Sequence, residues 1–585
     1  MASMNEPSRK KAKIASSDRY KPCHSDILID DQFANSFKSI FCNQDQSNFS
    51  IFEANKETTN INENSDSPKY ILVKEDSLVQ SSENSSVQSS IRSSDALDKA
   101  CDKKVGTIIG SPFKVGVLYD LFEKSFLLDL KSELANLKWN FRSNDLYEFY
   151  QTDDLKIIPN NIKSDCIKNL YNYLSSDEFV TFMERISGSK LVRGRIDLAA
   201  QQYKKGGYLL CHDDYVSGEK LRRKIAYIIY LVEEDWKYED GGCLGLYRKD
   251  ERGLPTDIVK KLVPKFNSMS FFITGENSFH EVEEVLRDDN ISRWSVTGWF
   301  YESYEANAGE CSSHQSSHSK LEGQSIPLFS VTPIPISACE IDDNNSILNL
   351  FINNEYLSPS SQDQILDNFL DNSSIELKDI FNADIYNNFV NEICDPKNID
   401  RYWENTKIGP PTLRKYSVFK KNANKPDFNS LLKDFAQNSS NSHSIKSLEN
   451  LVLCVLHFLN SEQFSKFLCT VTNLELKSSI QEVRKLDVGD YTLMHDSFDE
   501  PEGLDVIFSF LPNTNNNQTT AYNWDSQRFN GTTHYVSGSD ELLTIEPDRN
   551  TLSIVYRTEE TKRFVKKIIS NAEHPRFEVG MIFTE

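Results

Sequence analysis

The chain has 585 residues, 38% hydrophobic and 11% aromatic, so it is long enough for two or three domains with sizeable cores. Its formal net charge of −22 argues against a general nucleic-acid binder, because such proteins neutralise phosphates with basic side chains. The charge is compatible with a basic protein partner, whose encounter it would steer, and equally with an ordinary solvated surface.

The 11 cysteines are scattered, odd in number and without a CxxC pair, as in a reduced cytosolic or nuclear protein. No apolar run approaches the roughly 18 residues of a membrane-spanning helix, and the first residues lack the apolar stretch of a signal peptide. They do carry Arg9, Lys10, Lys11 and Lys13, which form either a nuclear import signal or a stray basic patch. We therefore expect a protein of the nucleus and cytoplasm with no membrane partner.

Residues 1–108 are rich in Ser, Asn, Asp, Gln and Lys and contain too little apolar surface to offset the entropy of ordering. This composition predicts a mostly disordered arm, in which only residues 27–52 could dock locally. We expect the first 105 or so residues to be dispensable for catalysis.

Residues 109–302 are expected to form the first domain. Apolar side chains at helical spacing predict a helix over residues 118–137. Short β-branched and aromatic runs then predict strands, in the segments IDLAAQQY (196–203), IAYIIYLV (225–232), SMSFFITG (268–275) and ISRWSVTGWFY (291–301). Helices followed by strands indicate an α+β, β-rich domain, a sandwich or barrel with helices in front of it.

Residues 303–327 read as a linker by composition. Beyond them, residues 328–480 read as helical, with amphipathic stretches at 429–437 and 447–468, and a second strand-rich block runs from about 490 to 585. The order of elements in residues 328–585 thus repeats that of the first domain.

A possible metal site begins in LLCHDDY, where His212 and Asp214 follow a strand-like run. Residues i and i+2 of a strand point the same way, so both can reach one metal. The pattern is weak alone, since His24 and Asp26 repeat it in the arm. His280 follows a later strand and turn and supplies a third ligand, which completes the two-histidine, one-carboxylate set of an open iron site.

Arg293 stands in an otherwise apolar strand, where a guanidinium is costly unless it meets an anion. It is shaped to grip a carboxylate with two parallel hydrogen bonds, and Ser295 on the same strand face adds a hydroxyl. The alternatives are a surface His280 among glutamates and an Arg293 paired with Asp288 or Asp289. Zinc is the rival metal, although H-E-x-x-H is absent and zinc gives no reason for a buried arginine.

The chain resembles the ribosomal prolyl hydroxylase group of Fe(II)- and 2-oxoglutarate-dependent oxygenases. In the first domain the resemblance rests on NDLYEFYQTDDLK, LLCHDDY, RRKIAYIIYL, GGCLGLY, SFHEVEEVL and SRWSVTGWF. It continues in DYTLMHDSF, DELLTIEP and SIVYRTEETKRFVKKI. It covers most of residues 112–585 and leaves the arm unexplained.

The resemblance implies two tandem double-stranded β-helix (jelly-roll) domains, each with supporting helices. It implies Fe(II), 2-oxoglutarate and O₂ as cofactors, with ascorbate as reductant. By motif position it makes His212, Asp214 and His280 the iron ligands. Arg293 would bind the distal carboxylate of 2-oxoglutarate, with Tyr203 and Tyr230 as hydroxyl donors, although both tyrosines also suit core packing.

Two features depart from the family pattern. Gly245 replaces an acidic residue expected in GGxLDLY, which we expect to alter substrate contacts near the pocket, and the loop 233–240 is long. In the second domain His495 and Asp496 are adjacent, so on a strand they face opposite ways, and Val565 and Lys566 stand where the distal histidine is expected. We therefore expect a degenerate domain that binds no iron.

The favoured activity is hydroxylation of a proline in a small-subunit ribosomal protein, coupled to oxidative decarboxylation of 2-oxoglutarate. One alternative is an oxygenase of the same type acting on another protein or on a nucleic-acid base, although the acidic charge disfavours direct nucleic-acid binding. The other is a non-catalytic scaffold or oxygen-responsive regulator of protein turnover. A pseudoenzyme would usually have lost a ligand, and the first domain retains all three.

Overall fold

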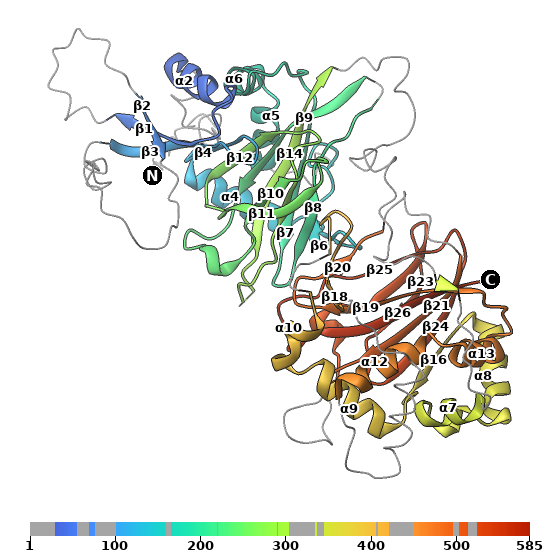
Figure 1. Cartoon of the computed structure of the whole chain (residues 1–585). Coiled ribbons are helices and arrows are strands. Elements are labelled where there is room, and N and C mark those ends of the chain that lie inside the picture. Colours follow the sequence, from blue (N-terminus) through green and yellow to red (C-terminus); the bar gives the residue numbers. More distant parts are fainter. Residues whose placement is uncertain are drawn as a thin grey trace, which may run out of the picture. The chain divides into compact units, whose positions relative to one another are not determined.

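The computed structural model describes residues 30–54, 70–75, 101–158, 165–218, 220–288, 290–303, 334–335, 344–404, 408–420, 448–494, 502–512 and 523–585. The chain divides into two compact units, residues 1–143 with 147–317 and residues 144–146 with 318–585. Both are β-rich with antiparallel sheets and supporting helices (Figure 1). In the described part of the chain, no helix is both long and apolar enough to cross a bilayer.

The sheet of unit 1 runs in the order β11-β10-β13-β8-β6-β7-β14-β9-β12-β4-β3-β1-β2, and β5 pairs with β6. Its strands are β1 (Asn48–Ala54), β2 (Tyr70–Glu75), β3 (Cys101–Ile109), β4 (Val115–Tyr119), β5 (Asn140–Ser143), β6 (Tyr147–Gln151), β7 (Ile196–Tyr203), β8 (Tyr208–His212), β9 (Leu221–Tyr230), β10 (Leu244–Lys249), β11 (Pro255–Leu262), β12 (Ser268–Ile273), β13 (His280–Val282) and β14 (Arg293–Ser303). All four strand segments predicted for this domain from the sequence are strands here.

Alternation along the strands of unit 1 separates two apolar clusters on opposite faces of the sheet. On β14, Val296 and Phe300 join the cluster under the helices, whereas Trp299 joins the cluster on the other face. The helices are α2 (Asp31–Phe41), α4 (Lys124–Ala135), α5 (Asp165–Leu174) and α6 (Asp177–Ser187). We call the sheet face away from these helices the open face.

The helix predicted over residues 118–137 begins later than expected. Val115–Tyr119 form β4, which pairs with β12 and β3, and the helix α4 occupies only Lys124–Ala135. Residues 115–119 lie between β12 and β3, whose edges offer backbone hydrogen-bonding groups. The hydrogen bonds gained by pairing with both strands outweigh the local helical pattern of these residues.

The prediction of a disordered arm is wrong for residues 30–54, 70–75 and 101–108, and the rest of residues 1–108 lies outside the described residues. The segment 31–41 is a helix capped by the Asp30 carboxylate, and β1 and β2 extend the sheet beyond β3. Phe37 is fully buried, with its ring centroid 5.8 Å from that of Phe271. Docking of residues 27–52 was foreseen, but their place in the main core was not.

The sheet of unit 2 runs in the order β15-β19-β26-β21-β24-β16, β18 pairs with β19, β17 pairs with β20, and a small sheet has the order β23-β22-β25. Its strands are β15 (Ile334–Pro335), β16 (Ser374–Lys378), β17 (Arg414–Lys415), β18 (Ser417–Val418), β19 (Ser478–Leu486), β20 (Tyr491–Thr492), β21 (Gly503–Phe510), β22 (Thr533–Ser537), β23 (Asp540–Ile545), β24 (Thr551–Arg557), β25 (Lys562–Val565) and β26 (Arg576–Thr584).

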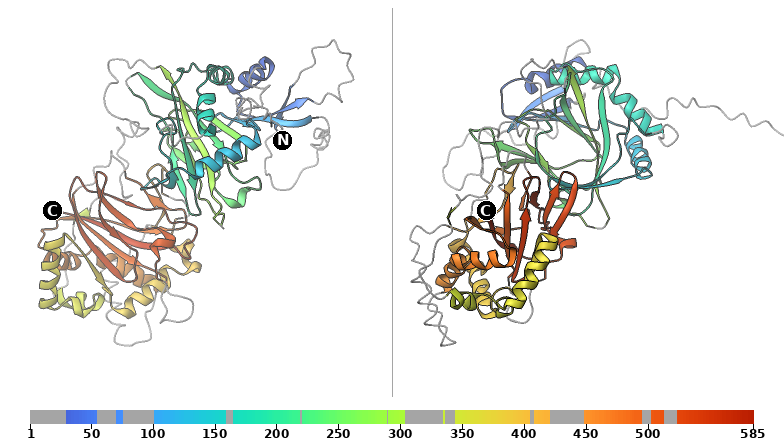
Figure 2. Two further views of the ribbon diagram at one scale, coloured as in Figure 1. Left: turned by 180° about the vertical axis from the view of Figure 1, so that it is seen from behind. Right: turned by 90° about the vertical axis from the view of Figure 1, so that its right-hand side faces the viewer.

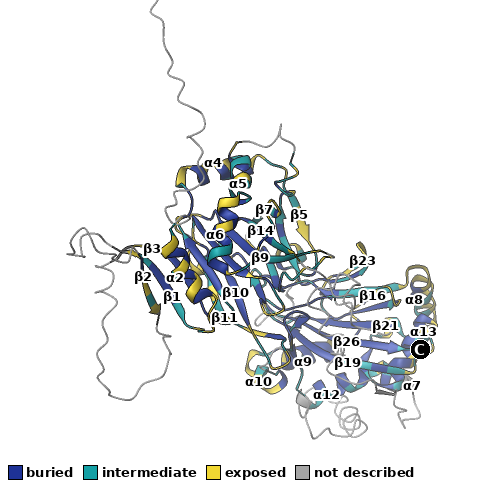
Figure 3. Cartoon of the chain, turned by 90° about the horizontal axis from the view of Figure 1, so that it is seen from above, coloured by how far each residue is buried: buried dark blue, intermediate teal, exposed yellow. Residues whose placement is uncertain are grey.

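The helices of unit 2 cover one face of its large sheet (Figure 2), as the shared apolar cluster also shows. They are α7 (Asn344–Phe351), α8 (Pro359–Asn372), α9 (Ala383–Ile393), α10 (Ile399–Tyr402), α12 (Leu448–Leu459) and α13 (Glu462–Thr472). The short helix α14 (Ser526–Phe529) packs into a separate apolar cluster through Phe529. The helical prediction for 447–468 is confirmed by α12 and α13; most of the predicted linker and the predicted helix at 429–437 lie outside the described residues. In each unit most residues of the central strands are buried, and β21 is buried along its whole length (Figure 3).

Because Phe37 fills the core between α2 and the sheet, Phe37→Ala should lower the free energy of unfolding of unit 1 by about 3–5 kcal/mol, as for other buried phenylalanines. Denaturant titration of the full chain, with hydrogen exchange of unit 1 amides, measures this. The matched change Phe141→Ala, at a side chain that is 55% exposed, should cost far less. If the two substitutions lowered the free energy of unfolding equally, α2 would not be part of the stabilising core of unit 1.

Candidate metal centre and cosubstrate pocket

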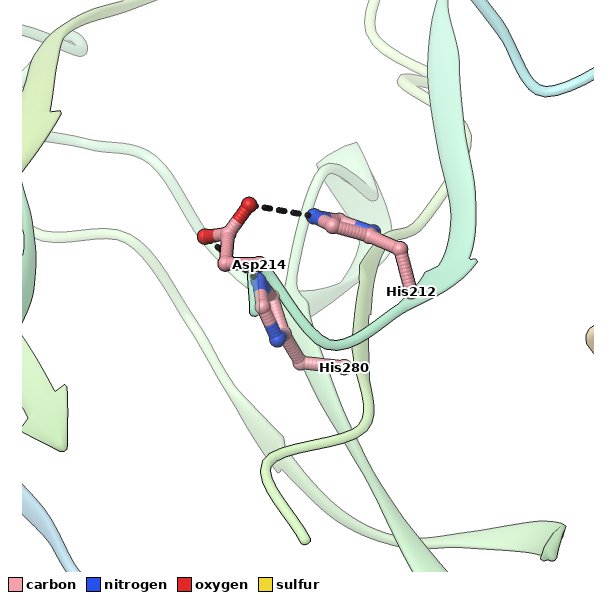
Figure 4. Close-up of side chains that lie close together, drawn as sticks. All are labelled: His212, Asp214 and His280. Carbon is pink, nitrogen blue, oxygen red and sulfur yellow. Dashed lines mark ion pairs between the residues drawn. The ribbon is translucent and has the colours of Figure 1, made fainter. Parts of the chain in front are cut away.

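Strand pairing brings the three predicted metal ligands together. In the antiparallel pair of β13 and β8, His280 is the cross-strand partner of His212, and their ring centroids are 4.2 Å apart. One ligand atom from each of His212, Asp214 and His280 lies within 4.8 Å of the others, and Asp214 faces both rings (Figure 4). The convergence predicted from the sequence is confirmed.

The two imidazoles are oriented by the same device. His212 Nδ1 lies 2.8 Å from the carbonyl oxygen of Leu210, and His280 Nδ1 lies 2.7 Å from that of Ser278. A carbonyl can only accept, so each Nδ1 carries the proton and each Nε2 keeps its lone pair. The Nε2 atoms of His212 and His280 lie 3.5 and 3.6 Å from the Asp214 carboxylate oxygens. Such support of the far ring nitrogen is typical of metal-binding histidines.

The protonation states also suit a metal. Burial, with a smaller effect of His280, lowers the pKa of His212 to about 4, so this imidazole is neutral at pH 7. Burial opposes ionisation of Asp214, but the nearby imidazoles of His280 and His212 hold the pKa of Asp214 well below its usual range. Asp214 also has a φ of 60°, a strained backbone conformation for a residue with a side chain, as is common at functional sites. His280 is only 3% exposed, which removes the surface-histidine alternative.

Ser278 ties the two ligand segments to each other. Its Oγ lies 2.8 Å from the carbonyl oxygen of Asp213, next to Asp214, and its own carbonyl accepts the proton of His280 Nδ1. Ser278 is buried, so no water replaces this contact without rearrangement. The hydroxyl therefore fixes the spacing of a ligand on one loop relative to a ligand on another strand.

A second polar centre surrounds Arg293, which is 1% exposed. Its Nε donates to the carbonyl of Gly242 at 2.7 Å, and its guanidinium carbon lies 5.1 Å from the ring centroids of both Tyr203 and Tyr230. Ser295 Oγ accepts weakly from Nη1 at 3.5 Å. The register of β14 with β7 and β9 explains this grouping, because Arg293 pairs with Tyr203 and Ser295 with Tyr230.

Two polar atoms of this centre lack a hydrogen-bond partner within the described part of the chain, Arg293 Nη2 and the Tyr230 hydroxyl. Asp288, the alternative partner, pairs with Lys205 instead, and Asp289 lies outside the described residues. Leaving a buried guanidinium nitrogen unpaired costs several kcal/mol, so the centre is built for an anion that supplies acceptors. The Tyr203 hydroxyl is already engaged with Gln201 at 3.2 Å.

Gly242 permits the approach of Arg293. Its φ is 64°, and a Cβ there would lie 2.7 Å from Arg293 Cδ, so only glycine fits. Gly245, which was expected to lie near the substrate pocket, lies on the other face of β10. Leu244 and Leu246 belong to the open-face cluster, whereas Gly245 faces Ile258 and Glu281, so its departure from the family pattern does not reach the pocket.

The metal centre and the arginine centre share the open face of the sheet. Phe272 packs edge-on against His280 at 4.7 Å between centroids, and it belongs to the same cluster as Tyr203 and Tyr230. Burial raises the pKa of the Tyr203 hydroxyl, and this hydroxyl lies within electrostatic range of both Arg293 and Asp214. Tyr203 therefore lies between the anion centre and the metal ligands.

The sequence reasoning missed Arg223 and Trp299 on the same face. The guanidinium of Arg223 stacks 3.6 Å from the centroid of the Trp299 ring, and its Nε has no hydrogen-bond partner in the described part of the protein. Strict alternation from Arg293 reaches Trp299. It misses Arg223, because the register of β14 and β9 shifts between Phe300 and Tyr301 and turns Arg223 to this face.

The open face of unit 2 contains ion pairs where unit 1 has its polar centres. On β19 and β26, Glu482, Arg484, Arg576 and Glu578 alternate with residues of the helix-side core. Arg484 forms ion pairs with Glu482 at 3.0 Å and with Glu578 at 3.4 Å. Asp505 forms ion pairs with Arg557 at 3.1 Å and with Arg563 at 2.9 Å. The described residues contain no second cluster of potential metal ligands. Val565 lies at the end of β25 and is buried; His495 and Asp496 lie outside the described residues.

Comparisons with known proteins agree with this geometry. Residues 198–301 match the 2OG-Fe(II) oxygenase superfamily, and residues 343–584 match the oxoglutarate and iron-dependent oxygenase degradation C-terminal domain. The prolyl 3-hydroxylase OGFOD1 of Xenopus laevis is 33% identical over 497 residues, which span 81% of this chain and 88% of the relative. The prolyl 3-hydroxylase sudestada1 of Drosophila melanogaster is 26% identical over 500 residues, 81% of this chain and 83% of the relative.

Among solved structures, a Pseudomonas putida prolyl-4-hydroxylase aligns with 33% of this chain and 93% of its own, at 19% identity and a TM-score of 0.26. The chain belongs to the family of Fe(II)- and 2-oxoglutarate-dependent prolyl hydroxylases that carry this C-terminal domain. It is a dioxygenase whose cofactors are Fe(II), 2-oxoglutarate and O₂.

If Ser278 fixes the ligand spacing, Ser278→Ala should weaken Fe(II) binding about 10–100-fold, the usual effect of losing support around a metal site. Anaerobic Fe(II) titration of the full chain with a competing chelator measures the affinity. Ser39→Ala, on the exposed side of α2, is the matched control and should change nothing. Unchanged iron affinity in Ser278→Ala would mean that the backbone alone sets the site.

The ion pairs of unit 2 and its adjacent His495 and Asp496 predict that the full chain binds one iron, in unit 1. Elemental analysis after anaerobic loading should give one Fe(II) per chain for the natural protein and for His495→Ala. His280→Ala should abolish stoichiometric binding. A second equivalent of iron that disappears in His495→Ala would contradict the degenerate character of unit 2.

Proposed function

We propose that this protein hydroxylates a prolyl residue of a small-subunit ribosomal protein and that its chemistry is confined to unit 1. The observation that carries the catalytic part is the pairing of a convergent His212–Asp214–His280 set with a buried, incompletely paired Arg293 on one sheet face. A 2-oxo acid can bind such a site at both ends, with its 2-oxo carboxylate end on a three-ligand metal and its distal carboxylate on the arginine. The substrate class rests on the family resemblance and on the acidic charge of the chain, −22.

His212, Asp214 and His280 would hold Fe(II) through the two Nε2 atoms and a carboxylate oxygen. When bound, the iron supplies the oxidative chemistry that couples decarboxylation of 2-oxoglutarate to hydroxylation of the substrate. Arg293 Nη2 and the Tyr230 hydroxyl would bind the distal carboxylate of 2-oxoglutarate. Tyr203, placed between the two centres, would orient the cosubstrate and exclude water.

Arg223 and Trp299 would contact the prolyl substrate. A guanidinium stacked on an indole ring presents donors for peptide carbonyls together with an apolar surface for the proline ring. Arg223 lies within electrostatic range of Asp214 and His212.

The fold assignment belongs to the same proposal. We take each unit as a double-stranded β-helix domain, with residues 109–302 catalytic, 303–327 a linker and 328–585 a degenerate oxygenase-like domain. Ascorbate would serve as the reductant that keeps the iron ferrous, and the protein would act in the nucleus and cytoplasm. The basic cluster at residues 9–13, which would direct import, lies outside the described residues.

The test of the function is mass spectrometry of small-subunit ribosomal proteins after incubation with the full chain, Fe(II), ascorbate and 2-oxoglutarate. We expect one protein to gain the mass of oxygen on a proline, with fragmentation assigning the residue. His280→Ala protein, treated identically, should leave every proline unmodified. Turnover of 2-oxoglutarate stimulated by a different protein, with ribosomal proteins unchanged, would redirect the proposal to that substrate.

Arg293→Ala should leave the iron site intact and raise the 2-oxoglutarate concentration needed for half-maximal rate by one to several orders of magnitude. The reason is that losing one partner of a desolvated charge pair costs about 2–5 kcal/mol. Arg293→Lys should rescue poorly, because an ammonium cannot make paired fork contacts. Succinate formation over a wide 2-oxoglutarate range, alongside thermal melting, measures this. A normal cosubstrate dependence in Arg293→Ala would show that another residue binds the carboxylate.

A further inference from the structure

Unit 2 contains a groove of about 860 Å³ that the proposed chemistry does not use. Its walls come from the last turns of α8, from β16 and β24 of the large sheet, from β23 of the small sheet, and from residues 546–548. The groove thus lies between the edge strands of the two sheets.

One wall of the groove is a strand edge that is open at Ser374 and Glu376, whereas the carbonyl of Lys378 in the same strand accepts a hydrogen bond from the Tyr356 hydroxyl. Among the described residues β16 pairs only with β24, and the Tyr556 amide donates to the Ser373 carbonyl at 2.8 Å. In an antiparallel ladder the hydrogen-bonded positions alternate, so Ile375 also turns its backbone groups to β24. Ser374 and Glu376 turn theirs outward, and their side chains line the groove.

The opposite wall is also a terminal strand. Within the described part of the chain, β23 pairs with β22 alone, and its Leu543, Thr544 and Ile545 line the groove. A polypeptide that enters the groove in an extended conformation can add a strand to β16, gaining backbone hydrogen bonds without any particular sequence. Exposed strand edges promote aggregation, and proteins usually protect them. An edge left unprotected is therefore a candidate binding site for another polypeptide.

The charged side chains of the groove indicate which polypeptides could bind there. Four charged side chains line it, and Lys378 pairs with Asp548 at 3.1 Å. Glu376 and Glu546 are left with hydroxyl partners only, Ser553 at 3.4 Å and Ser526 at 2.6 Å, and with no cationic partner in the described residues. Two carboxylates that form no ion pair within the described residues, beside an open edge, suit a strand with basic side chains on one face.

We propose that this groove binds an extended basic polypeptide segment, which adds to β16 as an extra strand and places lysine or arginine side chains against Glu376 and Glu546. The inference stands on unit 2 alone and does not depend on the identity of the hydroxylated substrate. A small apolar ligand fits the site poorly, because sites for such ligands are mostly apolar with few polar groups.

The test uses the full chain and three fluorescein-labelled 12-residue peptides followed by fluorescence anisotropy. The first alternates lysine and valine, the second has glutamate for lysine, and the third has proline for every second valine, which removes strand donors. The variants are Glu376→Lys and a matched control, Asp363→Lys, on an exposed part of α8 that does not line the groove. Both change the net charge equally, which matters for a chain of charge −22.

We expect the lysine–valine peptide to bind and the other two peptides to bind at least about tenfold more weakly. Glu376→Lys should raise the Kd of the first peptide about tenfold or more, as for loss of a close charge pair, while Asp363→Lys leaves it within about twofold. Exchange of the Glu376 amide should slow in the natural protein when the peptide is bound. Equal weakening by both variants, or equal binding of the proline peptide, would overturn the proposal in favour of unspecific attraction; melting curves confirm that the variants fold.

Discussion

The cross-strand pairing of His212 with His280 is the constraint on which the site depends. It sets two imidazoles side by side at the ends of β8 and β13, and the carbonyls of Leu210 and Ser278 hold both rings by their Nδ1 atoms. Both Nε2 lone pairs must then face the Asp214 carboxylate. A shift of the β13 register by one residue would turn His280 to the other face, so the chemistry is fixed by backbone hydrogen bonds before any metal binds.

The two units use the same sheet face in opposite ways. Within the described residues, the face of unit 1 away from the helices contains an arginine with an unpaired nitrogen, a tyrosine hydroxyl without a hydrogen-bond partner and a set of three potential metal ligands. In unit 2 the corresponding face contains Arg484 and Arg576, which form ion pairs with the buried carboxylates of Glu482 and Glu578. Removing one member of such a buried pair is costly, because the charge left behind stays buried without its partner.

Much of the site was predictable from the sequence, because its residues lie on strands with strict alternation. IDLAAQQY coincides with β7, and Arg293 and Ser295 share a face as period two requires. Features that depend on distant pairing were not predictable. The β14–β9 bulge that turns Arg223 toward Trp299 has no local signature. The arm was misjudged differently: Phe33, Phe37 and Phe41 have helical spacing, but the average composition of residues 1–108 concealed this pattern.

The most direct test of the account is a crystal structure of the full chain with 2-oxoglutarate and Mn(II), which replaces Fe(II) without oxidation. The account predicts one metal ion bound by His212 Nε2, Asp214 and His280 Nε2, and the distal carboxylate of 2-oxoglutarate on Arg293 Nη2 and the Tyr230 hydroxyl. It also predicts that the ion pairs of unit 2 remain as they are. A cosubstrate carboxylate bound away from Arg293, or a metal held by other side chains, would contradict it.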